Sequence, residues 1–403
     1  MRKKFLMFAL GVVAVVGLNG ILALEAEALP SFARSTGQSC ASCHTVWPML
    51  NSMGRQYKEA GYVNEEEEEA GGVNKISETL TLIKNAFSAR INFRLYDKKN
   101  YEKNPGNDGD LGRMRSLHEA EIYAAGIAGD GLSALLEIEA EEEAQSKGPG
   151  HAPMNGIPTD IVAGVLGYHP NQAVNIHLGL AEPIFADPYS AYANGRRVTR
   201  EWRRVVKGGF VTGGSQFISL SGRAQSLPNL FYLGAISGNA RDDLEHTPLG
   251  NYSLRTVYDA TSWLSVGGLY QGEKARYGYS GGKYANEADA SNLGLDATIQ
   301  FEDGLDANLC YVIRDDKEAN EKNNILAVEA GYPIPMRKTT VVPYSRVENY
   351  TTNDGKDKFT DIHFSLNCLI RPNLKGVINY EMIDKGEGGN DESRITVVAD
   401  LGF

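Results

Sequence analysis

The C-terminal stretch Arg394-Ile-Thr-Val-Val-Ala-Asp-Leu-Gly-Phe403 decides how this chain is expected to fold. Its apolar residues recur at every second position: Ile395, Val397, Ala399, Leu401 and Phe403. Small and polar residues fill the positions between them: Arg394, Thr396, Asp400 and Gly402. Side chains alternate between the two faces of a β-strand, so this stretch predicts a strand with one apolar face and one face that suits water.

The same alternation recurs from about residue 80 to the end of the chain. About sixteen such segments begin near Leu80, Ser116, Leu132, Ile161, Ala173, Val206, Asn229, Asn251, Trp263, Ser291, Leu305, Asn324, Thr339, Phe359, Leu374 and Arg394. Tight turns, such as Gly129-Asp130-Gly131, alternate with long polar connections, which we place at 97–115, 145–160, 183–205 and 273–290. An even number of strands joined in this way is typical of bacterial outer-membrane barrels. We therefore predict an all-β fold, a transmembrane antiparallel barrel of about sixteen strands over residues 80–403.

A soluble β-sandwich or propeller would show alternation and turns as well. It would not explain why Tyr168, Tyr270, Phe301 and Tyr332 collect near strand ends, where an outer-membrane barrel has its aromatic girdles. The chain also ends on an aromatic residue, Phe403, which closes an alternating strand. These features favour a barrel in contact with outer-membrane lipid.

The N-terminus has the pattern of a secretory signal peptide. Arg2, Lys3 and Lys4 precede an apolar run over 5–16, and Ala26-Glu27-Ala28 offers a small-residue cleavage site. We assign residues 1–28 to the signal peptide, with an uncleaved membrane anchor as the alternative. The formal net charge of −11 argues against nucleic acid as a partner and in favour of cations.

Between the signal and the barrel lies the stretch Cys40-Ala41-Ser42-Cys43-His44. Two thiols three positions apart followed at once by histidine form the attachment pattern of c-type haem. Cys40 and Cys43 would bond the porphyrin, and His44 would be the proximal iron ligand. A redox dithiol or half of a zinc site is the alternative, although a zinc site needs a second ligand pair and the nearby sequence offers none.

Residues 29–64 therefore read as a monohaem cytochrome c segment that contains a short helix through Arg55, Tyr57 and Lys58. Such a small unit has little core of its own, so it needs the covalent haem and a neighbouring surface. Residues 65–79, with an acidic run and Gly71-Gly72, read as a linker. Metal binding by the acidic run is the alternative interpretation.

The N-terminal region carries a family resemblance in Leu29-Pro-Ser-Phe-Ala-Arg34, Thr36-Gly37, the haem motif, Pro48, Leu50-Asn51, Gly54-Arg55 and Lys58 to Tyr62. In these residues the chain resembles the fused monohaem cytochrome and porin proteins of iron-oxidising bacteria. The match covers about 35 residues, and over the barrel it is architectural only. The resemblance implies ferrous iron oxidation at the cell surface, with the electron passing through one haem to a periplasmic c-type cytochrome or similar carrier.

The sixth ligand of the haem iron is open. Met53 and then Met49 lie close in sequence, and thioether ligation would raise the reduction potential. Methionines are more often ordinary packing residues, and a barrel histidine, His177 or His363, is a further possibility. Both histidines are expected on the luminal face of their strands.

An acidic wall is expected in two strands joined by the turn at Asp130. Its members recur at alternate positions: Glu119, Glu121, Glu137, Glu139 and Glu141. Their oxygens could lead hard divalent cations towards the haem, although a merely solvated channel wall is the simpler interpretation. Arg90, Arg94 and Arg255 could offset the charge. Cys310 is expected on the luminal face and Cys368 on the lipid face, so we predict that they form no disulfide.

The sequence thus predicts an outer-membrane electron-transfer oxidoreductase. Ferrous iron or another extracellular donor would pass electrons through a haem that lies on the periplasmic side or inside the lumen. One haem spans little of an apolar band about 25 Å tall, which favours a place inside the lumen. The alternative is a porin for small solutes whose haem segment acts as a plug or redox sensor.

Overall fold

The computed structural model describes residues 38, 40–60, 86–101, 113–129, 131–141, 159–171, 173–193, 198, 203–207, 209–240, 249–280, 283–302, 304–317, 319–336, 339–371, 373–384 and 392–402. The predicted signal peptide, the predicted linker and Phe403 lie outside these residues. Among the described residues, no helix is both long enough and apolar enough to cross a membrane.

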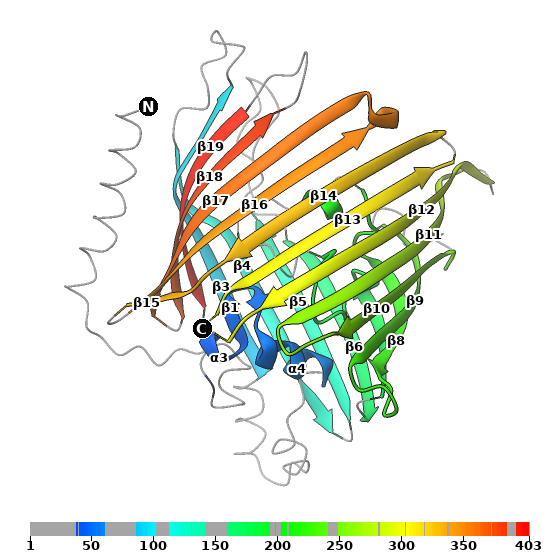
Figure 1. Cartoon of the computed structure of the whole chain (residues 1–403), viewed down its shortest axis with the longest axis horizontal. Helices are drawn as coiled ribbons and strands as arrows, with labels where there is room; N and C mark the ends of the chain where they lie inside the picture. Colours follow the sequence, from blue (N-terminus) through cyan, green and yellow to red (C-terminus); the bar gives the residue numbers. More distant parts are fainter. Residues whose placement is uncertain are drawn as a thin grey trace.

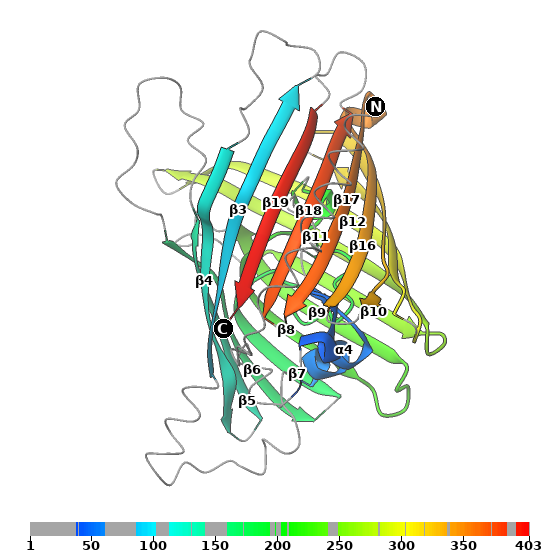
Figure 2. The ribbon, with the colours of Figure 1, turned by 90° about the vertical axis from the view of Figure 1, so that its left-hand side faces the viewer.

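Sixteen long antiparallel strands close into a barrel, as the sequence predicts. In chain order they are β3 (Phe87–Tyr101), β4 (Arg113–Gly129), β5 (Leu132–Glu141), β6 (Thr159–Asn171), β7 (Val174–Ala181), β8 (Ser215–Arg223), β9 (Leu230–Ala240), β10 (Asn251–Asp259), β11 (Leu264–Ser280), β12 (Lys283–Gln300), β13 (Asp306–Asp316), β14 (Glu321–Gly331), β16 (Thr339–Thr352), β17 (Asp357–Arg371), β18 (Leu374–Asp384) and β19 (Glu392–Gly402). A short strand, β15 (Ile334–Met336), lies in the β14–β16 connection, and a 3-10 turn, η4 (Asn353–Gly355), joins β16 to β17. The last strand pairs with the first, β19 with β3, which closes the barrel (Figure 2).

The alternation in sequence separates an outer face from an inner one. Leu293 and Leu295 on β12 are 55% and 63% exposed, whereas Asp296, the residue after Leu295, is 6% exposed. The outward face is therefore apolar and the luminal face polar, the pattern of a barrel that spans a membrane. This confirms the predicted faces of the segment that begins at Leu293.

Three predicted boundaries are wrong. The connection predicted at 97–115 is shorter, because β3 runs to Tyr101 and β4 begins at Arg113. The segment near Val206 is a single helical turn, α7 (Arg204–Lys207), inside the connection 182–214, and the strand begins only at Ser215. Conversely, the polar stretch 273–290 is a continuation of the β11–β12 hairpin and not a loop. Beyond the apolar band both faces of a hairpin meet water, so its side chains lose the alternation that marks a strand.

The two ends of the barrel differ. The tight connections 130–131, 172–173 and 372–373 lie at one end, here called the turn end. The other end, the loop end, has the longest connections, 102–112, 142–158, 182–214 and 241–250, together with short ones such as 281–282. In outer-membrane barrels short turns are periplasmic and long loops extracellular. The N-terminal elements lie at the turn end (Figures 1 and 2). They are α3 (Cys40–Cys43), β1 (His44–Val46), β2 (Met49–Leu50) and α4 (Ser52–Glu59).

The described residues of the β7–β8 connection, 182–193, 198, 203–207 and 209–214, fold into the barrel. Ile184, Tyr192, Val205 and Phe210 from this connection belong to one buried apolar cluster with residues of the wall from β9 to β14. The connection, called here the inner loop, therefore packs on one side of the lumen as a fixed internal layer.

Candidate functional site

The haem motif is held against α4 by Asn51. The side chain of Asn51 caps this helix, accepting a hydrogen bond from the backbone N–H of Gly54 at 3.1 Å. The same side chain donates to the carbonyl oxygen of Ser42 at 2.9 Å, and its backbone N–H donates to that of Cys43 at 2.9 Å. One residue thus fixes both the start of the helix and the middle of the CxxCH motif.

Gly54 permits the close approach of the helix to the motif. A Cβ atom at this position would lie 2.1 Å from the carbonyl oxygen of Cys43. No other amino acid fits there without moving the backbone. The Gly54-Arg55 element of the family resemblance therefore has a structural reason in this chain.

His44 has the geometry of a metal-binding imidazole. Its Nδ1 lies 3.3 Å from the carbonyl oxygen of Pro48, a contact in which the ring N–H donates. That hydrogen bond assigns the proton to Nδ1 and leaves the lone pair on Nε2, the usual arrangement of histidine ligands. Burial lowers the pKa of His44 to about 4, so the ring is neutral at physiological pH, the form that binds iron.

The cysteines complete the donor set. Burial raises the pKa of the Cys43 thiol, which is partly buried, and keeps it protonated. The side chain of Cys40 lies outside the described part of the structure, whereas its backbone forms the start of α3. Two cysteines on one helical turn, followed by a neutral histidine with a fixed tautomer, fit the covalent attachment and proximal ligation of a c-type haem.

The two methionines differ in their surroundings. Met49 is fully buried and packs in an apolar cluster with Val46, Val198, Val342 and Tyr344. Met53, on the first turn of α4, is 46% exposed. Which residue is the sixth ligand stays a prediction.

The N-terminal segment is clamped to the barrel wall on one side through Trp47. Arg90 of β3 and Lys375 of β18 both lie over its indole ring, at 4.4 and 5.0 Å from the centroid. Nζ of Lys375 also donates to the carbonyl oxygen of Trp47 at 3.2 Å. Two strands next to the closure of the barrel thus hold one residue three positions after the haem motif.

The opposite side of the segment is held at the end of α4. Arg223 of β8 forms a two-pronged ion pair with Glu59, with Nε–Oε2 and Nη2–Oε1 distances of 2.5 and 2.7 Å. Nζ of Lys58 donates to the carbonyl oxygen of Asp187 at 2.9 Å, and Nδ2 of Asn175 donates to that of Glu59 at 3.3 Å. The helix is therefore tied to β7, β8 and the inner loop across the turn end of the lumen.

The inner loop is anchored by a buried arginine of the wall. Arg255 is 0% exposed and lies between Asp187 of the loop, at 3.1 Å, and Asp296 of β12, at 2.5 Å. Its guanidinium also lies over the ring of Tyr192. Arg255 therefore offsets the charge of these two aspartates and not that of the predicted acidic wall.

The predicted acidic wall exists in large part. Oxygens of Glu119, Glu121 and Glu139 lie within 4.8 Å of one another. Arg90 contacts Glu119 at 3.3 Å and Glu121 at 2.6 Å, as expected. Arg94 lies 3.7 Å from Asp97, and the side chain of Glu141 lies outside the described part.

Glu137 lies on β5 opposite Tyr123. The carboxylate oxygens of Glu137 are not among the three grouped above. The hydroxyl of Tyr123 donates to Glu121 of the group. Two carboxylates of the wall, those of Glu119 and Glu121, are thus ion-paired with Arg90, which also lies over Trp47.

A second group of ligand-type side chains lies nearer the loop end, on β16 and β17. Glu348, Asp361 and His363 bring one ligand atom each within 4.8 Å of one another, and all three are 0% exposed. The sequence places Asp361 and His363 on the luminal face of one strand, but gives no indication that Glu348 lies beside them. That proximity comes from the β16–β17 register, in which Glu348 is opposite Asp361.

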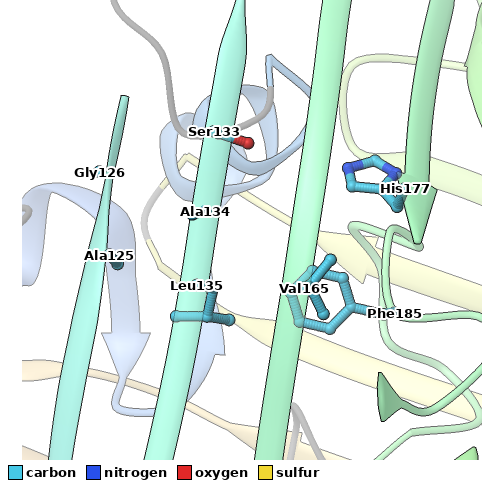
Figure 3. A pocket seen from close by; sticks show the side chains of 8 residues that line it. All are labelled: Ala125, Gly126, Ser133, Ala134, Leu135, Val165, His177 and Phe185. Carbon is cyan, nitrogen blue, oxygen red and sulfur yellow. The ribbon is translucent and has the colours of Figure 1, made fainter. Parts of the chain in front are cut away.

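His177 lies in a small recess near the turn end, together with Phe185 of the inner loop (Figure 3). Its ring meets that of His169 edge-on at 5.1 Å. His169 in turn hydrogen-bonds to Ser133 and Asn175, at 2.7 and 2.9 Å. The prediction that His177 and His363 line the lumen is confirmed, since both are buried on the inner face.

The two remaining cysteines are free and buried. Cys310 receives a contact from the guanidinium of Arg203 at 3.8 Å, in the interior. Cys368 lies on β17 in alternation with Phe364, which is 53% exposed on the outer face. The predicted absence of a disulfide between them is confirmed.

Comparisons with known proteins bear on the barrel. No family model and no curated protein matches this chain. The fold is similar to that of OmpF of Salmonella typhi in complex with daunomycin, with a TM-score of 0.55 and 11% identity over 79% of this chain and 97% of the other. A loop-deletion mutant of OmpT of Vibrio cholerae scores 0.52 and an anion-selective porin of Comamonas acidovorans 0.51, each 13% identical over 79% of this chain and 98% of the other. The chain therefore has the fold of outer-membrane porin barrels, and its function must be argued from the residues inside.

Proposed function

We propose that this protein conducts electrons across the bacterial outer membrane through a single c-type haem held by Cys40, Cys43 and His44 at the turn end of the lumen. The contact between Nδ1 of His44 and the carbonyl oxygen of Pro48 carries the proposal, because it leaves Nε2 free to ligate iron. A c-type haem supplies a reversible one-electron acceptor and donor. The expected donor is ferrous iron or another extracellular donor, and the expected acceptor is a periplasmic c-type cytochrome or similar carrier.

The placement of the segment supports this proposal. The turn end of an outer-membrane barrel faces the periplasm, so a haem there is within reach of a soluble carrier. Trp47, held by Arg90 and Lys375, fixes the motif on one side, and the Glu59–Arg223 ion pair fixes it on the other. The rate of electron transfer depends steeply on the distance between donor and acceptor. A segment held at both ends would keep the haem at a fixed distance from the barrel wall.

The apolar neighbours of the motif exclude water from its inner side. Val46 and Met49 are 0% exposed and pack with Val342 and Tyr344 of the barrel wall. Low local polarity and a restricted water supply are the means by which proteins tune the potential of a bound haem. The segment and the wall thus form one site that neither would form alone.

The interior of the barrel is packed with side chains, which is compatible with electron transfer but unfavourable for the diffusion of small solutes. Arg255 of β10 and Arg346 of β16 lie on the luminal face and are 0% exposed. The inner loop, which contributes the equally buried Arg203, contacts Arg255 through Asp187, and the N-terminal segment lies below. An electron conduit requires no open path for molecules, whereas a diffusion pore does.

Stopped-flow absorbance tests the proposal. Haem-loaded protein in detergent, oxidised and mixed with ferrous iron at neutral pH, is expected to develop the bands of reduced haem within the mixing experiment. A haem that stays oxidised with ferrous iron but is reduced by dithionite would exclude iron as the donor. The matched variant Gln56→Ala changes an exposed residue of the same helix and is expected to behave as the wild type.

A porin with a haem-bearing plug is the second candidate, and the fold favours it. The structures with a similar fold include an anion-selective porin of Comamonas acidovorans. Conductance in planar bilayers separates the two functions. Steady ion currents through the wild type would establish the porin, while a closed barrel with a reducible haem supports the conduit.

A further inference from the structure

We propose that Glu348, Asp361 and His363 form a binding site for a first-row divalent metal cation on the luminal wall near the loop end. The inference rests on the proposed function in one respect, since it makes this cation the electron donor and ferrous iron its natural occupant. The binding site itself follows from the arrangement of the side chains and is testable without electron transfer.

The three side chains meet because of strand pairing. Glu348 of β16 and Asp361 of β17 are directly opposite each other in the ladder, and His363 is the next luminal residue of β17. Their ligand atoms lie within 4.8 Å of one another, and the side chains are 0% exposed. Two carboxylates and one imidazole from two adjacent strands can thus converge on a single ion.

Two opposed carboxylates in a buried ladder repel each other unless positive charge lies between them. Arg204 of the inner loop supplies part of it: its Nε pairs with Oδ2 of Asp361, and its backbone N–H donates to Oε1 of Glu348 at 2.8 Å. Arg346 lies 3.0 Å from Oε2 of Glu348. In the described part of the structure, Oδ1 of Asp361 is buried and accepts no hydrogen bond.

Among the described residues, the neighbourhood carries more negative than positive charge. Four buried carboxylates, those of Glu329, Glu348, Asp361 and Glu381, face three guanidiniums, those of Arg203, Arg204 and Arg346. One further cation at the carboxylate pair would balance the excess and complete the environment of Oδ1 of Asp361. Arginine is bulky and already paired there, so a small ion is the group that fits.

The donor set selects the class of ion. Carboxylate oxygens alone suit calcium and magnesium, whereas an imidazole nitrogen beside them suits iron, manganese and zinc in the divalent state. The other carboxylate cluster, at Glu119, Glu121 and Glu139, has no histidine among its grouped atoms. We therefore assign the metal site to the wall formed by β16 and β17.

The position of the cluster links the loop end to the haem segment. On the loop side it is covered by Tyr350 and Phe359, which stack with 4.8 Å between centroids, and Phe210 of the inner loop packs edge-on against Tyr350. On the turn side, Tyr344 lies on the same face of β16 and packs with Val46 and Met49. Glu348 and Tyr344 are four positions apart along the strand, about 13 Å at ~3.3 Å per residue.

Manganese binding tests the site. Free Mn²⁺ gives a six-line electron paramagnetic resonance signal in solution that is lost on binding, and Mn²⁺ does not donate an electron to a haem at neutral pH. Titration of the haem-loaded wild type in detergent is expected to remove one equivalent of Mn²⁺ signal. The double variant Asp361→Asn with His363→Gln is expected to weaken this binding at least tenfold.

The matched control is Glu119→Gln with Glu121→Gln, which removes two carboxylates from the other cluster and should leave the Mn²⁺ affinity within twofold of wild type. Circular dichroism and the haem absorbance of each variant check that the barrel and segment are intact. Unchanged binding in Asp361→Asn with His363→Gln, or an equal loss in both double variants, would overturn the site.

The outcome is independent of the proposed function. If Mn²⁺ binds at the cluster and ferrous iron fails to reduce the haem, the iron-oxidising function is wrong while the metal site stands. If ferrous iron reduces the haem equally fast in wild type and in Asp361→Asn with His363→Gln, and Mn²⁺ binding is also unchanged, the metal site is wrong and the conduit stands.

Discussion

The guanidinium of Arg90 lies over the indole ring of Trp47, 4.4 Å from its centroid. Arg90 also reaches Glu121 of β4 and Asp400 of β19, at 2.6 and 3.1 Å. The strand that closes the barrel, the acidic wall and the N-terminal segment therefore meet at one side chain. This contact makes the docking of the segment sensitive to a single aromatic residue.

Replacing Trp47 by Leu is expected to loosen the segment. Each cation–π contact stabilises by ~0.5–2 kcal/mol, so losing those with Arg90 and Lys375 should raise the undocked population about fivefold or more. The measurement is the rate of protease cleavage within α4, with bilayer conductance as a second readout. Trp263→Leu is the control, because Trp263 stacks on Phe301 at 5.3 Å, away from the segment. Equal cleavage rates in both variants would contradict the prediction.

The ion pair between Glu59 and Arg223 should show energetic coupling. It is two-pronged and mostly buried, with side-chain exposures of 18% and 20%. A double-mutant cycle of Glu59→Gln and Arg223→Gln, read by the same cleavage assay, is expected to give a coupling of about 1–3 kcal/mol. Arg223 also contacts Asp259 at 2.7 Å, so its single variant should cost more than that of Glu59. A coupling near zero would mean that the pair does not hold the helix.

Gly54→Ala is expected to prevent haem attachment. The added Cβ would lie 2.1 Å from the carbonyl oxygen of Cys43, so α4 or the haem motif must move. Backbone displacement of this kind destabilises by several times the ~1 kcal/mol that alanine normally contributes to a helix. The covalent haem content per chain, from the pyridine haemochrome spectrum, should fall below a tenth of wild type. Ser52→Ala, an exposed change on the same helix, is the control; normal haem content in Gly54→Ala would show that the approach is not required.

Much of the barrel could be predicted because lipid and water impose opposite demands on adjacent residues. Leu293 and Leu295 have to face outward and Asp296 inward, and this alternation is visible in any such strand. The alternation is absent, and the prediction of a strand is lost, where both faces of a strand meet the same medium. The β11–β12 extension lies beyond the apolar band, and Val205 in the inner loop is buried against a wall that lies far away in sequence.

The site was predictable only in part for a related reason. Cys43 and His44 belong to one short motif, so their chemistry is contained in consecutive residues. Glu348 and Asp361 become neighbours through the register of two strands, and a shift of one residue would separate them to opposite faces. Likewise, nothing local connects Glu59 with Arg223, which lie 164 positions apart.

Docking of the N-terminal segment is expected to strengthen at alkaline pH through Lys58. Burial lowers the pKa of Lys58, whereas in an undocked, solvated segment the pKa returns to its ordinary value of about 10.4. Between the lowered pKa and about 10.4 the undocked state holds a proton that the docked state has released, so docking is favoured as pH rises through this window and levels off above it. Protease cleavage of α4 between pH 7 and 10.5 should therefore slow with rising pH relative to Lys58→Met. That variant loses the bond to the carbonyl of Asp187 and should be cleaved faster throughout, but without the pH-dependent part due to Lys58. Parallel pH profiles for the two proteins would show that Lys58 keeps its proton when docked.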